Sequence, residues 1–265
     1  ALIANGNESQ HFGNRIQDVD VFALTEVLEK YSILIQALDL RYHRLSNSST
    51  EALNKVIAST RLAYLNLKGN NFQNVSALLG LNARPNSKEN WANSRIKSLD
   101  ISENPIVDLM DLADSLEYNH SIAALNVSSV DSLKTNELIK FAIKLRSHPL
   151  KVFRANSPPL VKLSHEVIVH WAETLRLNHS LRILELSKCG LTCHDIQLLI
   201  QHGILLNEKG TALRVLDLNG NHIGCDGAYW ISKWLQQDDC ELQQLCLSYN
   251  RIGLVGGSHI AEALS

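Results

Sequence analysis

The chain has 265 residues, of which 45% are hydrophobic, and its 25 basic and 27 acidic residues give a formal net charge of −2. This near balance excludes the strongly basic surface that nucleic-acid-binding proteins need. No run of about 18 apolar residues is present, which excludes a membrane-spanning helix. We therefore expect neither nucleic acid nor a membrane as a partner.

The cysteines bear on the compartment. There are five of them, an odd number, and all lie in the last third of the chain. No basic segment precedes an apolar stretch at the N-terminus, so no signal peptide is visible. Together these features predict free thiols in a reducing compartment, which is an intracellular, cytoplasmic location or the cytoplasm of a host cell into which the protein is delivered.

An eleven-residue pattern, L-x-x-L-x-L-x-x-N/C-x-L, recurs along the chain. The first positions of successive copies are 26 to 34 residues apart. A repeat at a fixed period of this length predicts a stack of similar structural units rather than an ordinary globular core. Five copies are clear, and they begin at Leu62, Ile96, Leu181, Leu213 and Leu242. Three weaker copies begin at Ile35, Ile122 and Leu150.

The N-terminal third departs from the pattern in three places. Residues 1–34 predict a partial repeat or cap, with apolar residues at helical spacing from Val21 to Leu28. His43 stands where the pattern expects Asn. The longest step contains an insertion at residues 81–95, which we expect to loop out at the edge of the stack.

The middle and the end of the chain differ in regularity. Val130 and Pro158 replace the expected Asn or Cys, so irregular turns are predicted at both. The last two copies are regular, and the chain stops at Ser265, where the next strand would be due. No capping unit is evident there, and we expect the chain to be part of a longer protein.

Each copy continues into a stretch with helical periodicity, so each unit is predicted to be a short strand, a turn and a helix of about three turns. The predicted fold is α/β, a leucine-rich repeat solenoid with the shape of a curved horseshoe. Parallel strands would line its concave face and helices its convex face, in about eight to nine repeats. One domain is expected to span residues 1–265, since no linker interrupts the repeats.

Long units of this kind resemble the ribonuclease-inhibitor-like class of leucine-rich repeats. The likeness is sharpest after the Asn of the copy that begins at Leu213, where the turn reads Ile223-Gly224-x-x-Gly227-Ala228. The resemblance implies a protein that binds other proteins through an extended surface, and it covers nearly the whole chain. It implies the repeat class and does not name a partner.

The pattern also predicts which side chains face a partner. Successive strand residues point to opposite faces, so the residues between the inward leucines point outward and align in rows. Tyr and Arg are enriched at interface hot spots, which makes them the expected anchors. The alternative is that Asp and Asn at these positions only keep the strands soluble. The predicted binding residues are Asp39, Arg41, Tyr42, Tyr64, Asn66, Lys68, Asp100, Glu103, Arg154, Asn156, Glu185, Lys188, Asp217, Asn219 and Tyr249.

A secondary surface is predicted from exposed aromatic residues, which often mark interfaces. Its members are Trp91 in the insertion and Tyr229, Trp230 and Trp234 on the helix after Asn221. The alternative is that Trp234 fills a gap against a neighbouring helix and that Trp230 covers it.

Motifs for chemistry were not found. Cys189-x3-Cys193-His194 and His222-x2-Cys225 are the only clusters of potential zinc ligands, and neither completes a tetrahedral set. No nucleotide-binding or hydrolase motif occurs. We therefore expect no metal, no cofactor and no enzymatic activity.

The function predicted is a monomeric, non-catalytic scaffold that binds a protein through its concave face. Two alternatives remain open. One is a regulator of a small GTPase, similar to the activators of the Ran GTPase, although neither an acidic tail nor the edge residues of that family can be mapped here. The other is a ligand-sensing or effector module, either of a larger receptor or of a microbial protein that targets a host.

Overall fold

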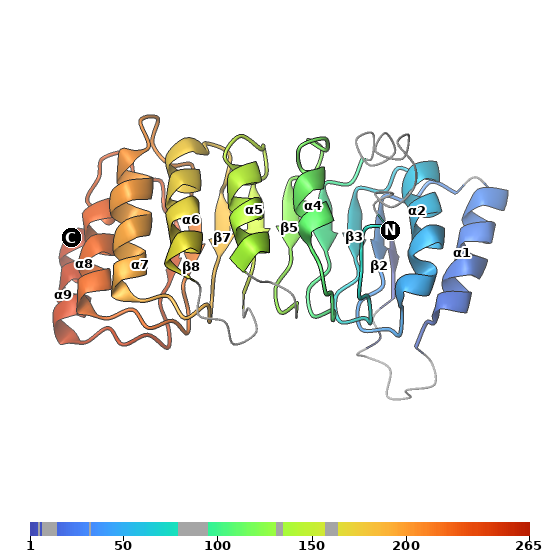
Figure 1. Ribbon diagram of the computed structural model, residues 1–265, viewed down its shortest axis with the longest axis horizontal. Coiled ribbons are helices and arrows are strands. Elements are labelled where there is room, and N and C mark those ends of the chain that lie inside the picture. The colour runs from blue at the N-terminus through green and yellow to red at the C-terminus, as the bar shows by residue number, and fades with distance from the viewer. Residues whose placement is uncertain (5, 7–14, 32, 79–94, 131–134, 157–163) are drawn as a thin grey trace. The chain divides into compact units, whose positions relative to one another are not determined.

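The structure is a computed structural model that describes residues 1–4, 6, 15–31, 33–78, 95–130, 135–156 and 164–265. The chain forms two compact units, Ala1–Leu133 and Lys134–Ser265, called unit 1 and unit 2 below. Figure 1 labels helices and strands of both units. Apart from Arg95, the predicted insertion at 81–95 lies outside the described residues. A single domain over residues 1–265 stays a prediction.

Unit 1 alternates strands and helices. Five strands among its described residues pair in parallel and in chain order, each in register with the next, so that Leu38 lies beside Leu65 and Leu65 beside Leu99. The strands are β1 (Leu2–Ile3), β2 (Ala37–Asp39), β3 (Tyr64–Asn66), β4 (Ser98–Asp100) and β5 (Ala124–Asn126). The helices are α1 (Asp18–Lys30), the 3-10 turn η2 (Asn47–Ser49), α2 (Thr50–Ser59) and α4 (Met110–Ser115).

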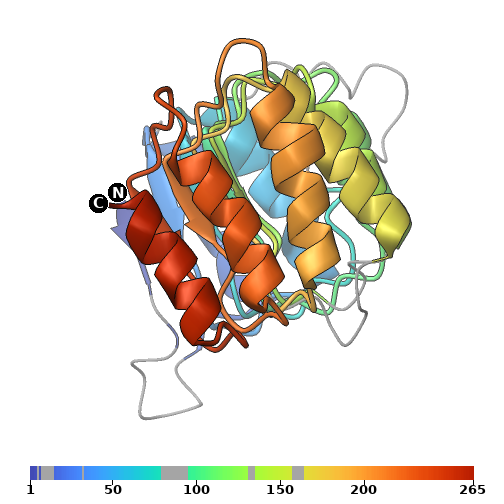
Figure 2. The same ribbon diagram turned by 90° about the vertical axis from the view of Figure 1, so that its left-hand side faces the viewer.

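Unit 2 repeats the same arrangement. In the part of this unit that the structure describes, four strands are parallel and in chain order, and the helices form one layer beside them (Figure 2). The strands are β6 (Val152–Arg154), β7 (Ile183–Glu185), β8 (Val215–Asp217) and β9 (Gln244–Cys246). The helices are α5 (Thr135–Leu145), α6 (His165–Leu177), α7 (Cys193–Gln197) with its continuations η4 (Leu198–Gly203) and η5 (Ile204–Leu206), α8 (Cys225–Leu235) and α9 (Leu254–Ala263). The predicted α/β leucine-rich repeat fold is confirmed.

The core lies between the strands and the helices of each unit. The second and third leucine positions of the pattern are buried throughout unit 1, as Leu65 and Leu67 illustrate. In unit 2 the core includes aromatic rings: Phe153 lies 5.2 Å from Trp171 and 5.5 Å from Phe141, measured between ring centroids. Removal of this apolar surface from water is the main force that holds neighbouring repeats together.

The Asn of the pattern joins each turn to the preceding repeat. Asn104, which is buried, donates from Nδ2 to the carbonyls of Leu67 and Ile101 and accepts from the backbone N–H of Phe72. These bonds satisfy backbone groups that no strand partner reaches. The same set of bonds is made by Asn70, Asn221 and Asn250.

The turn at Val130 corrects an expectation. Ser129 has a positive φ of 53°, as do the equivalent residues of the regular turns, and Glu103 donates its backbone N–H to the carbonyl of Ser128. The predicted irregularity is therefore wrong for the turn up to Val130, whose side chain is fully buried. An apolar residue at the Asn position is therefore compatible with the regular backbone at residues 128 and 129. Pro158, the second predicted irregular turn, lies outside the described residues.

His43 takes over the role of Asn in the copy that begins at Ile35. Its Nδ1 accepts from the backbone N–H of Ile16 at 3.2 Å, and its Nε2 lies 3.2 Å from the carbonyl oxygen of Ala4. The first bond needs an unprotonated Nδ1. Burial lowers the pKa of His43, and the nearby Arg15 lowers it further against the opposing effects of Ala4 and Asp39.

We expect this histidine to make stability depend on pH. Because the pKa of His43 is lower in the folded protein, the unfolded chain takes up the proton first, and the free energy of unfolding falls as the pH drops through the ordinary value of 6.5. Urea unfolding of the wild type and of His43→Asn, at about pH 8 and about pH 5, measures this. The wild type should lose more stability than the variant on acidification. An equal loss in both proteins would contradict the assignment.

Candidate functional site

The outward strand residues of unit 1 lie where the repeat pattern places them, but most of the acidic and amide side chains also hold the backbone. Asp39, Asn66 and Asp100 each accept a hydrogen bond from the backbone N–H two residues further along. Asx turns of this kind stabilise the exit from a strand. The recurrence of Asp and Asn at this position is thus explained by the hydrogen bond that stabilises the turn.

In unit 2 the backbone N–H at the exit of each strand named below is also bound by a side chain. Asp217 makes the same turn with the N–H of Asn219. Where Glu185 occupies the position, the N–H of Ser187 is bound instead by Asn156 of the preceding repeat, at 2.9 Å. In the last repeat, the N–H of Ser248 is likewise bound by Asn219 of the repeat before it. Asn156 and Asn219, predicted as binding residues, therefore complete the turns of their neighbours.

Three predicted residues of unit 1 meet in one cluster, although they come from three successive repeats. Lys68 Nζ lies 3.0 Å from Glu103 Oε1 and 5.7 Å from the centroid of the Tyr42 ring. Burial opposes the charge of Lys68, but hydrogen bonds to Glu103 and Tyr42 outweigh it and raise the pKa of the ammonium group. Arg41, next to this cluster, pairs with Asp39 at 2.7 Å.

The two residues that contact Lys68 have a left-handed backbone conformation. Tyr42 and Glu103 have φ values of 58° and 56°, which are uncommon for residues other than glycine. Lys188 and Tyr249 of unit 2 share this conformation. Ser129 has it too, so this left-handed conformation belongs to the turn of the repeat.

Glycine occupies the same turn position beside two of these residues. A Cβ at Gly69 would lie 2.3 Å from the ring of Tyr42, and one at Gly220 would lie 2.8 Å from the side chain of Lys188. The two glycines therefore leave room for the side chain of the preceding repeat to lie across them.

In unit 2 the predicted anchor Arg154 is already engaged. Its Nε lies 2.6 Å from Glu185 Oε1, and Asn156 donates to Glu185 Oε2 at 2.8 Å. Such a network fixes the three side chains relative to one another but leaves Arg154 fewer free donors for a partner. Tyr249 is different: it is 91% exposed, and its side chain forms no hydrogen bond with any described residue.

One row of outward residues was missed from the sequence. Val152, Ile183 and Val215 stand on neighbouring strands directly beside one another and are half-buried. They form an apolar strip alongside Arg154, Glu185 and Asp217. Each of them directly precedes the second leucine position of its copy, and this position could have been used to find them in the sequence. Tyr64 of unit 1 stands at the same position and is the one residue of this row among the predicted binding residues. Tyr64 is 55% exposed.

The secondary surface is only partly present. Trp234 is 1% exposed, so its prediction as a surface residue is wrong; it fills the space between α8 and its neighbours, as the alternative held. Tyr229 and Trp230 are accessible and stack edge to face, with ring centroids 5.6 Å apart. His259 and Lys233 also lie against Tyr229. Trp91 lies outside the described residues.

The described residues contain no group of three or more His, Cys, Asp or Glu side chains that could hold a metal ion. Cys193 Sγ instead accepts from the backbone N–H of Gly224 at 3.1 Å. All five cysteines are free, and burial raises the pKa of Cys189 and Cys240 above the ordinary range of a thiol. Among the described helices none is long and apolar enough to cross a membrane.

A family of known proteins matches one copy of the repeat. The family described as "Leucine Rich repeat" matches residues 211–231, which include β8 and the first part of α8. No curated protein matches the chain in sequence. Among solved structures, internalin C2 from Listeria monocytogenes str. 4b F2365 is similar over 92% of this chain and 80% of its own, at 14% identity and a TM-score of 0.45. The ribonuclease-inhibitor-like class stays a prediction. With its recurring strand, Asn-bonded turn and helix, and the family match in the copy of the pattern that begins at Leu213, this chain is a leucine-rich repeat protein.

Proposed function

We propose that the protein is a non-catalytic scaffold that binds another protein through its strand face. By strand face we mean, in each unit, the outward side chains of the strands and of the turns that follow them. It corresponds to the face that the sequence predicts to be concave. The observation that carries this proposal is the presence of highly exposed tyrosines, Tyr64 and Tyr249, on a backbone fixed by ladders of side-chain hydrogen bonds.

The physical argument concerns the entropy of binding. An interface loses affinity when side chains and loops must be ordered on association. Around Tyr64, the neighbouring Asn66 is held by the N–H of Lys68, and Lys68 by Glu103. A partner would therefore meet a surface that is already ordered, with large aromatic groups available for burial. In unit 2 the apolar strip of Val152, Ile183 and Val215 adds further surface for burial.

An intracellular or host-cytoplasmic location, a monomeric state and the absence of enzymatic activity belong to the same proposal. The five free thiols favour a reducing compartment. The polar side chains of the strand face are engaged in structural bonds, as Glu185 is with Arg154 and Asn156, rather than arranged around a reacting group.

The test is affinity capture from a cell extract with matched tyrosine variants. Tyr64→Ala and Tyr249→Ala should each reduce the recovery of specifically bound protein about tenfold, which corresponds to an interface hot spot. Tyr31→Ala is the control, because Tyr31 is 63% exposed but lies at the end of α1, away from the strands. Full recovery with both strand-face variants, or equal loss with Tyr31→Ala, would refute the proposal.

A further inference from the structure

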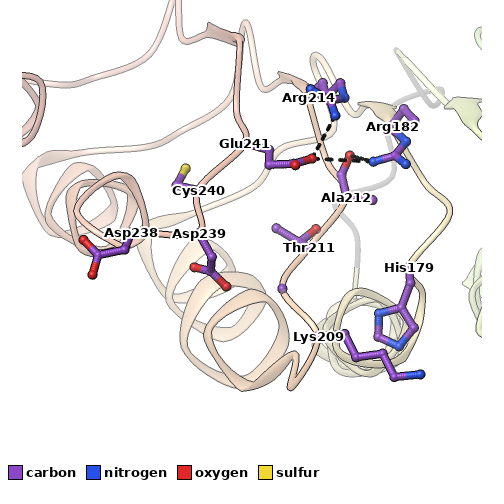
Figure 3. A pocket seen from close by; sticks show the side chains of 11 residues that line it. His179, Arg182, Lys209, Thr211, Ala212, Arg214, Asp238, Asp239, Cys240 and Glu241 are labelled. Atoms are coloured by element: carbon purple, nitrogen blue, oxygen red, sulfur yellow. Dashed lines mark hydrogen bonds and ion pairs between the residues drawn. The ribbon is translucent and has the colours of Figure 1, made fainter.

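A cavity of about 440 Å³ lies in unit 2, at the edge where strands β7, β8 and β9 begin. Three successive loops line it, each of which leads from a helix into one of these strands (Figure 3). Its volume is within the range of known ligand sites. The outward strand residues do not line it, so it is separate from the strand face.

Two arginines meet at one carboxylate in this cavity. Arg182 and Arg214 stand directly before β7 and β8, at equivalent positions of neighbouring repeats. Arg214 Nη2 donates to Glu241 Oε2 at 2.9 Å, and Arg182 Nη1 lies 3.7 Å from the same oxygen. Arg182 is additionally held by a bond of 3.0 Å to the carbonyl of Ala212. The guanidinium groups are thus placed to bind a carboxylate.

The ion pairs of Glu241 with the two arginines are exposed to solvent. The side chain of Glu241 is 51% exposed, and those of the two arginines are 40% and 38% exposed. Ion pairs at such exposure are screened by water and are individually weak. A carboxylate supplied by a ligand could therefore replace that of Glu241, with the displaced side chain returning to solvent.

The other charged side chains of the cavity are separated by sign. His179 and Lys209 lie on one side, and Asp238 and Asp239 on the other (Figure 3). In the part of the chain that the structure describes, none of these four takes part in an ion pair. The two aspartates oppose the entry of a multiply charged anion and favour a cation beside the bound carboxylate.

We propose that this cavity binds a peptide segment of the protein partner in which one residue separates an acidic residue from a basic one. The acidic side chain takes the place of Glu241 between Arg182 and Arg214, and the basic side chain faces Asp238 and Asp239. Charge-assisted bonds between arginine and carboxylate supply the specificity. This inference rests on the proposed function, since it names one feature of the partner.

The experiment uses the full chain and a defined probe, the acetylated and amidated tripeptide Glu-Gly-Lys. Binding is followed by NMR through the Nε–Hε signals of Arg182 and Arg214. Saturable shifts are expected, and the peptide Gln-Gly-Lys should bind at least about fivefold more weakly, because it lacks the carboxylate. Arg214→Gln should remove the response. Glu241→Gln should strengthen binding about twofold or more, because it removes the internal competitor.

The outcomes separate this inference from the proposed function. Tyr64→Ala, on the strand face, should leave peptide binding unchanged even where it abolishes capture of the partner. The absence of saturable shifts, an equal response to Gln-Gly-Lys or to inorganic phosphate, or weaker binding by Glu241→Gln would overturn the assignment of the cavity. None of these results would alter the outcome of the capture experiment with the tyrosine variants.

Discussion

Replacing Trp171 by alanine should lower the free energy of unfolding by about 4 kcal/mol, the typical cost of removing a buried tryptophan. Trp171 is 1% exposed, and its ring lies 5.2 Å from that of Phe153. The substitution leaves a cavity between α6 and β6 in the aromatic core of unit 2, which the rigid stack of repeats can close only in part. Urea unfolding followed by far-UV circular dichroism measures the loss.

Trp171→Phe is the matched control. Among the described residues, no group pairs with Trp171 Nε1, so phenylalanine removes a buried donor that has no partner while it keeps most of the ring. This variant should lose less than about 1.5 kcal/mol. If phenylalanine is as costly as alanine, the indole N–H has a partner and the packing argument fails.

The second large effect is expected at the turn asparagines. Asn70→Ala should cost about 3 kcal/mol, because it leaves buried backbone groups without a partner. Asn70 donates to the carbonyls of Leu40 and Leu67 and accepts from the N–H of Leu45. The carbonyl of Leu67 keeps a bond from Asn104, so the cost falls on the other two groups.

The adjacent residue provides the control for this prediction. Asn71 is exposed, and its backbone N–H donates to the carbonyl of Leu45, whereas its side chain forms no hydrogen bond with the residues that the structure describes. Asn71→Ala should therefore change the free energy of unfolding by less than about 0.5 kcal/mol. The measurement is urea unfolding. An equal decrease in the free energy of unfolding of the two variants would show that the side-chain hydrogen bonds of Asn70 do not stabilise the stacked repeats.

The fold followed from the sequence because the repeat is redundant. Each copy of the pattern contains the same alternation of inward and outward residues. The weak copy that begins at Ile35 could therefore be recognised by alignment with the clear copies. His43 shows the limit of this reasoning: the pattern marked it as an exception, but only the structure reveals that its ring bonds to Ile16 and Ala4. Bonds of this kind depend on residues 27 and 39 positions away.

The candidate site was harder to predict, since the sequence shows which side chains point outward but not what they touch. Arg154 was a predicted anchor, yet Glu185 of the next repeat binds it. Asn156 was assigned to a partner, although it completes the turn at Ser187. Trp234 was placed on the surface because helical spacing does not reveal how closely α7 and α9 pack against α8. Each of these depends on contacts between repeats.

The assignment of binding to the strand face is tested most directly by cross-linking from single positions. A photoreactive phenylalanine analogue would replace Tyr64 or Tyr249 on the strand face, and Tyr31 or Tyr229 on the helices, in otherwise unchanged protein. We predict that the same partner is cross-linked from positions 64 and 249 and not from positions 31 and 229. Cross-linking from the helix positions alone would contradict the account and place the partner on the helices.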